Sequence, residues 1–169
     1  GFESASQVLT GEALGSGDRR RFARQVWLIM AWAAASAALV ALTYLMAGGA
    51  IARSFSTSRE VAATVTGYVG WAVALPLAGV ASFVFDGVFI GASWTRAMLI
   101  SMAAALAIFV GLLFAAAPLG NHGLWLAFTL FFIARAAGQA ILLPGLARRS
   151  FPTVPPLTPA SASPTASPR

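Results

Sequence analysis

The chain has 169 residues, of which 59% are hydrophobic and only 9% are charged, and its mean hydropathy is +0.80. Soluble domains carry roughly 25% charged residues, and a soluble chain of this size cannot hide so much apolar surface. The basic residues are all Arg, and they exceed the acidic ones by 11 to 5. They lie mainly at the ends of apolar runs, so membrane topology explains the positive charge better than nucleic-acid binding does. The absence of Cys excludes disulfides and thiolate metal sites.

Residues 1–18 predict the end of a helix followed by a turn. Residues 1–14 are too few and too polar to span a bilayer, which takes about 20 apolar residues. Gly15 to Gly17 should break this helix, and Asp18 is a suitable N-cap for the next one. Because the first residue is Gly rather than Met, we expect the chain to be a piece of a longer protein.

Two long apolar stretches, residues 25–52 and 61–92, each predict a membrane-spanning helix. Between them, Thr57 and Glu60 have the spacing of a capping box, which favours a helix start. The second stretch is long for a single crossing, which suggests tilt, a kink or projection beyond the hydrocarbon. Pro76 lies at its middle, where a missing backbone hydrogen bond should kink the helix.

Two shorter apolar stretches, residues 97–117 and 124–147, predict a third and a fourth span. The Pro- and Ser-rich segment 150–169 has too little apolar content to fold and predicts a disordered tail. We therefore expect an all-α, multi-pass membrane protein with four full spans in residues 19–149. The end of a preceding helix, in residues 1–18, comes before them.

The arginines predict the orientation of these spans. If residues 19–24, the turn at Arg96 and the tail share one side, that side holds four, one and three arginines. The opposite side then holds two, in the loop 53–59, and none in the loop 118–123. Positive residues concentrate on the cytoplasmic side, so we expect a multi-pass protein of the inner membrane with a cytoplasmic C-terminus.

The only charges within the apolar stretches are Asp86 and Arg135. An ionisable residue at bilayer depth costs about 3 kcal/mol on insertion scales, so it marks a functional site by default. Gln139, one helical turn after Arg135, extends the same polar stripe. These three residues are candidates for a substrate or ion pathway. The alternative is structural: an ion pair that fixes helix packing, or a carboxylate that reaches to the interface.

The depths of Asp86 and Arg135 in the bilayer also predict that they are partners. Measured from the arginine-rich ends of their helices, the two positions differ in depth by the rise of only a few residues. Gly87 and Gly91 have the GxxxG spacing that permits close helix packing, and we expect packing within one chain rather than dimerisation. His122, the only histidine, is expected to be a solvated loop residue.

Motifs for enzymatic chemistry are absent from the sequence. The glycines at 15 and 17 lack the downstream Gly and the Lys-Ser/Thr of a phosphate loop, and there is no HExxH, no GxSxG and no cluster of carboxylates. We therefore expect no enzyme, no resident metal and no cofactor.

Two segments resemble the multidrug and toxic compound extrusion (MATE) transporters. The first is QVLTGEALGSGD followed by arginines, which resembles a junction at the cytoplasmic end of a helix in that family. Its matching residues are Gln7, Gly11, Gly15, Gly17 and Asp18. The second runs from Pro76 through FDGVFIGA to Thr95 and Arg96, and it is similar to the DinF-like branch (DNA-damage-inducible protein F).

This resemblance implies a twelve-helix transporter built from two six-helix lobes, with both termini cytoplasmic. Residues 1–149 would then be the end of helix eight and helices nine to twelve, part of the C-terminal lobe. The family exports drugs and other organic compounds in exchange for inward-moving H⁺ or Na⁺. The implied partners are membrane lipid, the missing N-terminal lobe and a small organic substrate, with no nucleic acid.

Two other functions remain open at this point. A flippase of the same superfamily would move lipid-linked sugars, and its anionic substrates would favour basic cavities. A purely structural four-helix subunit would have no translocation path.

Overall fold

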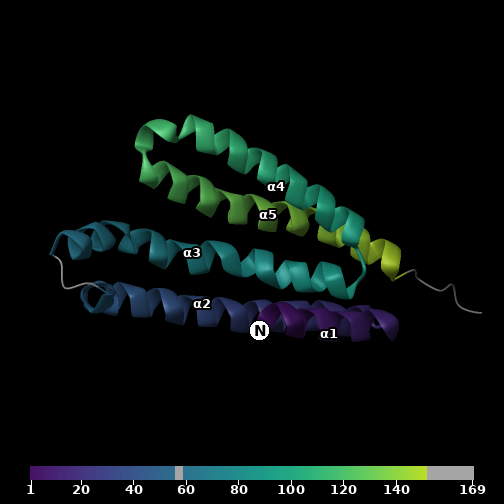
Figure 1. Ribbon diagram of the computed structural model, residues 1–169. Coiled ribbons are helices and arrows are strands. Elements are labelled where there is room, and N and C mark those ends of the chain that lie inside the picture. Colours follow the sequence, from purple (N-terminus) through teal and green to yellow (C-terminus); the bar gives the residue numbers. More distant parts are fainter. Residues whose placement is uncertain (56–58, 152–169) are drawn as a thin grey trace, which may run out of the picture.

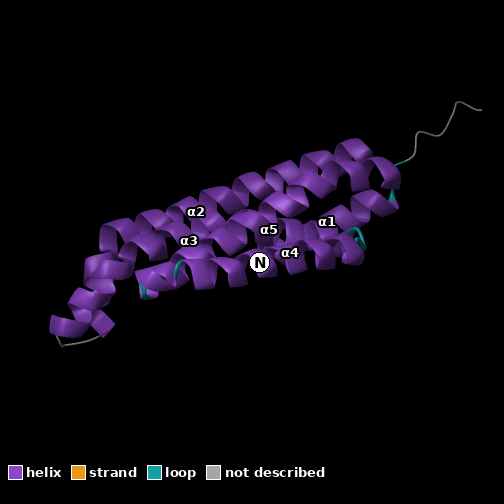
Figure 2. Cartoon of the chain, turned by 90° about the horizontal axis from the view of Figure 1, so that it is seen from above, coloured by secondary structure: helices purple, strands orange, loops and turns teal. Residues whose placement is uncertain are grey.

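The computed structural model is entirely helical over the residues it describes (Figures 1 and 2). It describes the backbone of residues 1–55 and 59–151 and the side chains of residues 1–50 and 63–151. The helices are α1 (Phe2–Gly15), α2 (Arg19–Phe55), α3 (Arg59–Gly91), α4 (Thr95–Ala115), the short 3₁₀ helix η1 (Ala117–Leu119) and α5 (Asn121–Ser150). Within the described residues, α2, α3, α4 and α5 are long and apolar enough to cross a membrane. The predicted all-α class with four spans is confirmed.

Helix α3 is the centre of the bundle. It packs against α1, α2 and α5, whereas α4 packs mainly against α5. Figure 1 shows two antiparallel pairs, α2 with α3 and α4 with α5, with α1 lying along one end of the first pair. The α1–α2 junction, the α3–α4 turn and the end of α5 meet at this end, which we call the basic end. Its arginines are Arg19, Arg20, Arg21, Arg24, Arg96, Arg148 and Arg149.

The chain turns sharply from α1 into α2 because Gly17 adopts a left-handed backbone, with φ of 70°. The amides of Gly17 and Asp18 donate to the carbonyls of Leu14 and Ala13, at 3.0 and 3.1 Å, which is the hydrogen-bond pattern of a Schellman helix end. Asp18 then caps α2, because its Oδ1 accepts from the Arg21 amide at 2.8 Å. The predicted cap is confirmed.

Several boundaries differ from the sequence-based expectation. Helix α5 begins at Asn121 rather than at 124, because Gly120, with φ of 57°, completes the turn within three residues of Pro118. It also continues through Ser150, and Phe151 is buried, so both residues belong to the bundle and not to the tail. Segment 152–169 and the capping box at Thr57 lie outside the described residues.

Helices α1 and α3 approach each other closely at two glycines. A Cβ atom at Gly87 would overlap the Glu3 carbonyl oxygen, and one at Gly91 would overlap the Gln7 carbonyl oxygen. On the α1 side, Ser6 and Gly11 are small enough to permit this approach. The GxxxG spacing therefore serves contact within the chain.

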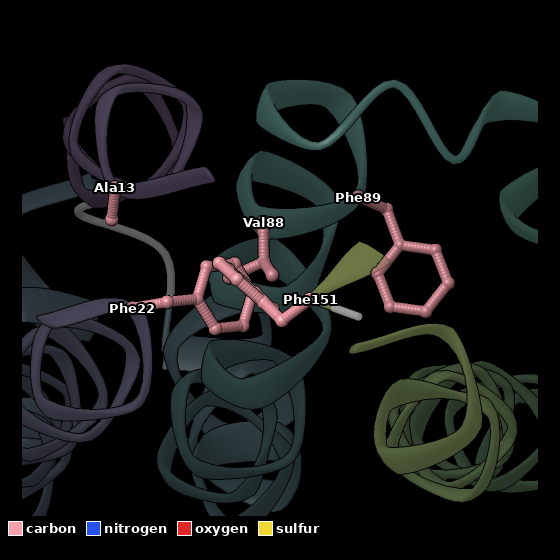
Figure 3. Packing of buried hydrophobic residues seen from close by; sticks show 5 residues of the cluster. All are labelled: Ala13, Phe22, Val88, Phe89 and Phe151. Atoms are coloured by element: carbon pink, nitrogen blue, oxygen red, sulfur yellow. The ribbon is translucent and has the colours of Figure 1, made fainter. Parts of the chain in front are cut away.

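A cluster of large side chains closes the basic end of the bundle (Figure 3). The rings of Phe22 and Phe151 lie 5.4 Å apart between centroids, and Val88 packs beside them. Trp94, in the α3–α4 turn, meets Phe89 edge-on at 5.5 Å, and its indole N–H donates to Ser150 Oγ at 3.1 Å. This cluster joins the start of α2, the end of α3 with its following turn, and the end of α5, which are distant in the sequence.

The glycine contact gives a first prediction. Replacing Gly87 with Ala should lower the free energy of unfolding by about 1–3 kcal/mol, because the added methyl group overpacks the α1–α3 contact. Unfolding of the purified chain in detergent, followed by circular dichroism, measures the change. Gly111→Ala is the matched control, because a Cβ at Gly111 has nothing within 4 Å. Equal stability of the two variants would contradict the close contact.

Candidate functional site

Three polar side chains meet at the interface of α3 and α5. Arg135 Nη2 donates to Asp86 Oδ2 at 2.5 Å, and Gln139 Nε2 donates to Asp86 Oδ1 at 2.8 Å. Each carboxylate oxygen therefore has its own donor, one of them charged. The structure confirms the pairing of Asp86 with Arg135 that their depths predicted, and it adds Gln139 as a direct partner. We call Asp86, Arg135 and Gln139 the polar triad.

The triad is hidden from the surface of the bundle. Asp86 is 3% exposed, Arg135 is 8% exposed and Gln139 is fully buried. An unpaired charge at this depth would be costly, and the ion pair with its additional hydrogen bond offsets that cost. The polar stripe on α5 thus faces protein and not lipid.

Two polar atoms of the triad lack hydrogen-bond partners among the described residues. They are Arg135 Nε, a donor, and Gln139 Oε1, an acceptor, and both are buried. Buried polar groups nearly always have partners, and those without one call for an explanation. The triad therefore retains one spare donor and one spare acceptor beside the carboxylate.

Helix geometry places these groups together. Arg135 and Gln139 are four residues apart, so they project from one face of α5 toward the same carboxylate. Behind that helix, Gly138 faces Ser101 of α4, and a Cβ at Gly138 would make an ordinary contact with the Ser101 Cβ, at 3.4 Å. On α3, buried Ser82 is one turn before Asp86, but its hydroxyl donates to the Gly79 carbonyl at 2.8 Å. Ser82 is therefore occupied by its own helix.

The other candidate residues lie apart from the triad. Pro76 is inside α3 and lines an aromatic groove of about 520 Å³ in the half of the bundle farther from the basic end. Of the junction residues, Gln7 and Gly11 lie within α1, at its contact with Gly91 of α3, and Gly15 ends that helix. Gly17 and Asp18 form the turn into α2, near an exposed ion pair between Glu12 and Arg21 at 2.7 Å. The Gln7 side chain is exposed, and a Cβ at Gly15 would have nothing within 4 Å.

His122 is exposed, as expected, but it belongs to a helix and not to a loop. It lies in the first turn of α5, where its Nδ1 accepts from the Trp71 indole N–H at 3.0 Å and its ring stacks on Tyr68 at 4.7 Å. Sequence reasoning missed this cluster because Trp71 and His122 are on different spans and only the rotation of α3 brings them together. The available signal was that Tyr68 and Trp71 lie in the first half of α3, at the same end of the bundle as the turn before α5.

Comparison with known proteins identifies the family. The model of the MatE family matches residues 1–117. The DNA damage-inducible protein F of Escherichia coli (strain K12) is 34% identical over 148 residues, which cover 84% of this chain and 31% of that protein. The chain belongs to the MatE family. No solved structure gives a significant match to it.

The MatE assignment confirms the resemblance to multidrug and toxic compound extrusion transporters, and the similarity to the E. coli protein confirms the DinF-like branch. MatE proteins are membrane transporters and not enzymes. The chain spans about a third of the length of the relative that it matches. Asp86 lies within the segment covered by the family model, whereas Arg135 and Gln139 lie beyond it.

The triad gives a second prediction. Asp86→Asn or Arg135→Gln alone should lower the stability of the bundle by about 3–5 kcal/mol, because each leaves a buried charge without its partner. The double variant Asp86→Asn/Arg135→Gln has no buried charge and should regain most of that loss. Thermal unfolding in detergent measures all three, with the exposed Arg96→Gln as control. A double variant that is as unstable as the sum of the single variants would contradict a paired site.

Proposed function

We propose that this chain is part of the C-terminal lobe of a cation-coupled exporter of drugs or other organic compounds. Family membership supports transport, and the buried carboxylate of the triad is the observation that supports coupling to a cation. In such folds, one lobe rocks against another around a site near the bilayer midplane. The partner of this bundle would be the N-terminal lobe of the same protein.

Asp86 is the proposed ion-pathway residue, with Arg135 and Gln139 as the groups that respond to it. When a proton or Na⁺ neutralises the carboxylate, Arg135 loses its counter-ion inside the bundle. The guanidinium then needs a new acceptor, and its spare Nε donor and the spare Gln139 Oε1 give the network room to rearrange. A change in packing between α3 and α5 follows from this loss of attraction.

The basic end is proposed to face the cytoplasm, which makes the chain a multi-pass inner-membrane protein with a cytoplasmic C-terminus. The arginines at that end support this orientation by the positive-inside rule. The arginine count assumes that the α1–α2 junction, the α3–α4 turn and the end of α5 lie on one side of the membrane. The bundle supports this assumption, because the three segments meet in one cluster.

The structural-subunit alternative has one observation in its favour. A well-paired Asp86–Arg135 contact is also what a static packing device requires. The proposed transport function gives the two spare polar atoms a use, because a rearranged network would engage them.

The third prediction separates these alternatives in a protein that contains both lobes. If Asp86 carries the coupling ion, Asp86→Asn/Arg135→Gln should be present at normal level in the membrane and yet show no ion-driven efflux of a fluorescent organic cation. Inverted vesicles with an imposed H⁺ or Na⁺ gradient measure the efflux. Retained efflux in the double variant would favour a structural role for the triad.

The fourth prediction concerns the chain of 169 residues alone. Alternating access requires two lobes, so proteoliposomes that contain only this chain should show no ion-driven dye efflux. Protein-free liposomes give the background, and the two-lobe protein is the positive control. Efflux above background, at a protein density where the chain is monomeric, would contradict the two-lobe requirement.

A further inference from the structure

A groove with a basic mouth runs between α2 and α5, over α3, and starts at the basic end. It has a volume of about 400 Å³. Its walls and floor are apolar apart from Arg19 at its mouth, and Phe85 of α3 forms part of the floor. The other lining residues belong to α2 and α5, and they include Trp27 and Pro144. A groove with a cation at its mouth and apolar walls below matches a lipid, which has a charged headgroup and apolar chains. A water-filled cavity would have polar walls.

Below Phe85 the groove continues deeper along α3 and α5. Phe85 also lines the next hollow, which reaches Ala74 on α3 and Thr129 on α5. From Phe85 to Ala74 the helix rises about 16 Å. This is close to the depth of one leaflet, since the hydrocarbon core is about 30 Å thick. An acyl chain that begins below Arg19 therefore has an apolar path across its leaflet.

Arg19 is available to a ligand at the mouth of the groove. Within the described part of the chain, no ion pair engages it, whereas its neighbour Arg21 is paired with Glu12. The Asp18 carboxylate accepts from the Arg21 amide. Across the groove, Arg148 lies one helical turn beyond Pro144 and so projects from the same face of α5. Of the two arginines, Arg19 is the one that lines the groove itself.

We propose that this groove binds one anionic phospholipid, with its phosphate at Arg19 and an acyl chain over Phe85. Three features point to this occupant: the cationic mouth, the apolar path below it, and Trp27 at the rim. Trp27 is 69% exposed, and tryptophan prefers the headgroup level of a membrane. Basic pockets between membrane helices on the cytoplasmic side bind anionic headgroups. This site is separate from the triad; it rests on the proposed orientation of the basic end and not on the proposed transport.

Native mass spectrometry of the chain in detergent tests the proposal, with equimolar phosphatidylglycerol and phosphatidylcholine added as probes. We expect one phosphatidylglycerol to bind per chain in preference to phosphatidylcholine. Arg19→Gln should weaken phosphatidylglycerol binding about five-fold, because one Arg near an anionic lipid surface contributes on the order of 1 kcal/mol. Arg96→Gln removes the same charge from the same end, away from the groove, and should leave the binding unchanged.

The apolar part of the groove has its own matched pair of variants. Ala140 lines the deeper hollow and is exposed, so Ala140→Phe should obstruct the acyl chain and reduce the binding of phosphatidylglycerol. Ala104→Phe adds the same bulk on the exposed face of α4, where it lines no groove, and should have no effect. Excess glycerol 3-phosphate, which has the phosphate but no acyl chain, should not displace the lipid.

Three results would overturn the proposal. Equal losses in Arg19→Gln and Arg96→Gln would mean diffuse attraction to the basic end and no defined site. Displacement by glycerol 3-phosphate would mean a plain phosphate site. A dimer that Ala140→Phe dissociates would mean that a second copy of the chain occupies the groove. Circular dichroism of each variant checks that its helix content matches that of the parent chain.

Discussion

A charged carboxylate inside a bilayer requires a partner, and this requirement governs how α3 and α5 pack. A carboxylate at the depth of Asp86 is costly, and charge-assisted hydrogen bonds to its oxygens offset that cost. Arg135 and Gln139 meet that requirement from a single face of α5. Sliding α5 by one turn or rotating it away from α3 would separate the charges inside the bundle. The triad therefore sets both the depth and the rotation of α5 relative to α3, whereas apolar contacts between two lipid-compatible helices are far less selective.

The short segment around Asp86 shows how one helix can satisfy two different neighbours. Asp86 faces α5, and the next residue, Gly87, faces α1 without a side chain. Successive residues of a helix point about 100° apart, so an acid followed by glycine offers an ion pair to one side and a close backbone contact to the other. Gly91 repeats the close contact one turn later. This explains why α3 can be the central helix of the bundle.

The fold could be predicted from the sequence largely because the membrane limits the possible structures. Long apolar runs must be helices, and charge and turn residues mark their ends, so the four spans and the cap at Asp18 were predictable. The pairing of Asp86 with Arg135 followed from depth alone. The contact between His122 and Trp71 could not be predicted from the sequence, because it depends on the rotation of α3 about its axis. A span with apolar residues on all faces does not define that rotation. The burial of Phe151 was also missed, because the residues that follow it have the composition of a disordered tail. Its contact with the Phe22 ring, which buries it in the bundle, depends on tertiary packing.

The incomplete hydrogen bonding of the triad bears on whether it is static. Net stability alone does not account for the triad, since replacing a buried ion pair by well-packed apolar side chains is often neutral or stabilising. A partly satisfied network is worse still, because each orphaned polar group in a medium of low dielectric constant has a desolvation cost and nothing to offset it. Arg135 Nε and Gln139 Oε1 both carry that cost in this arrangement. Their cost is understandable if the network has a second arrangement in which the spare donor and acceptor are used. A pair of states that differ in the charge of Asp86 would supply such an arrangement, and the role in transport proposed for the triad requires such a pair.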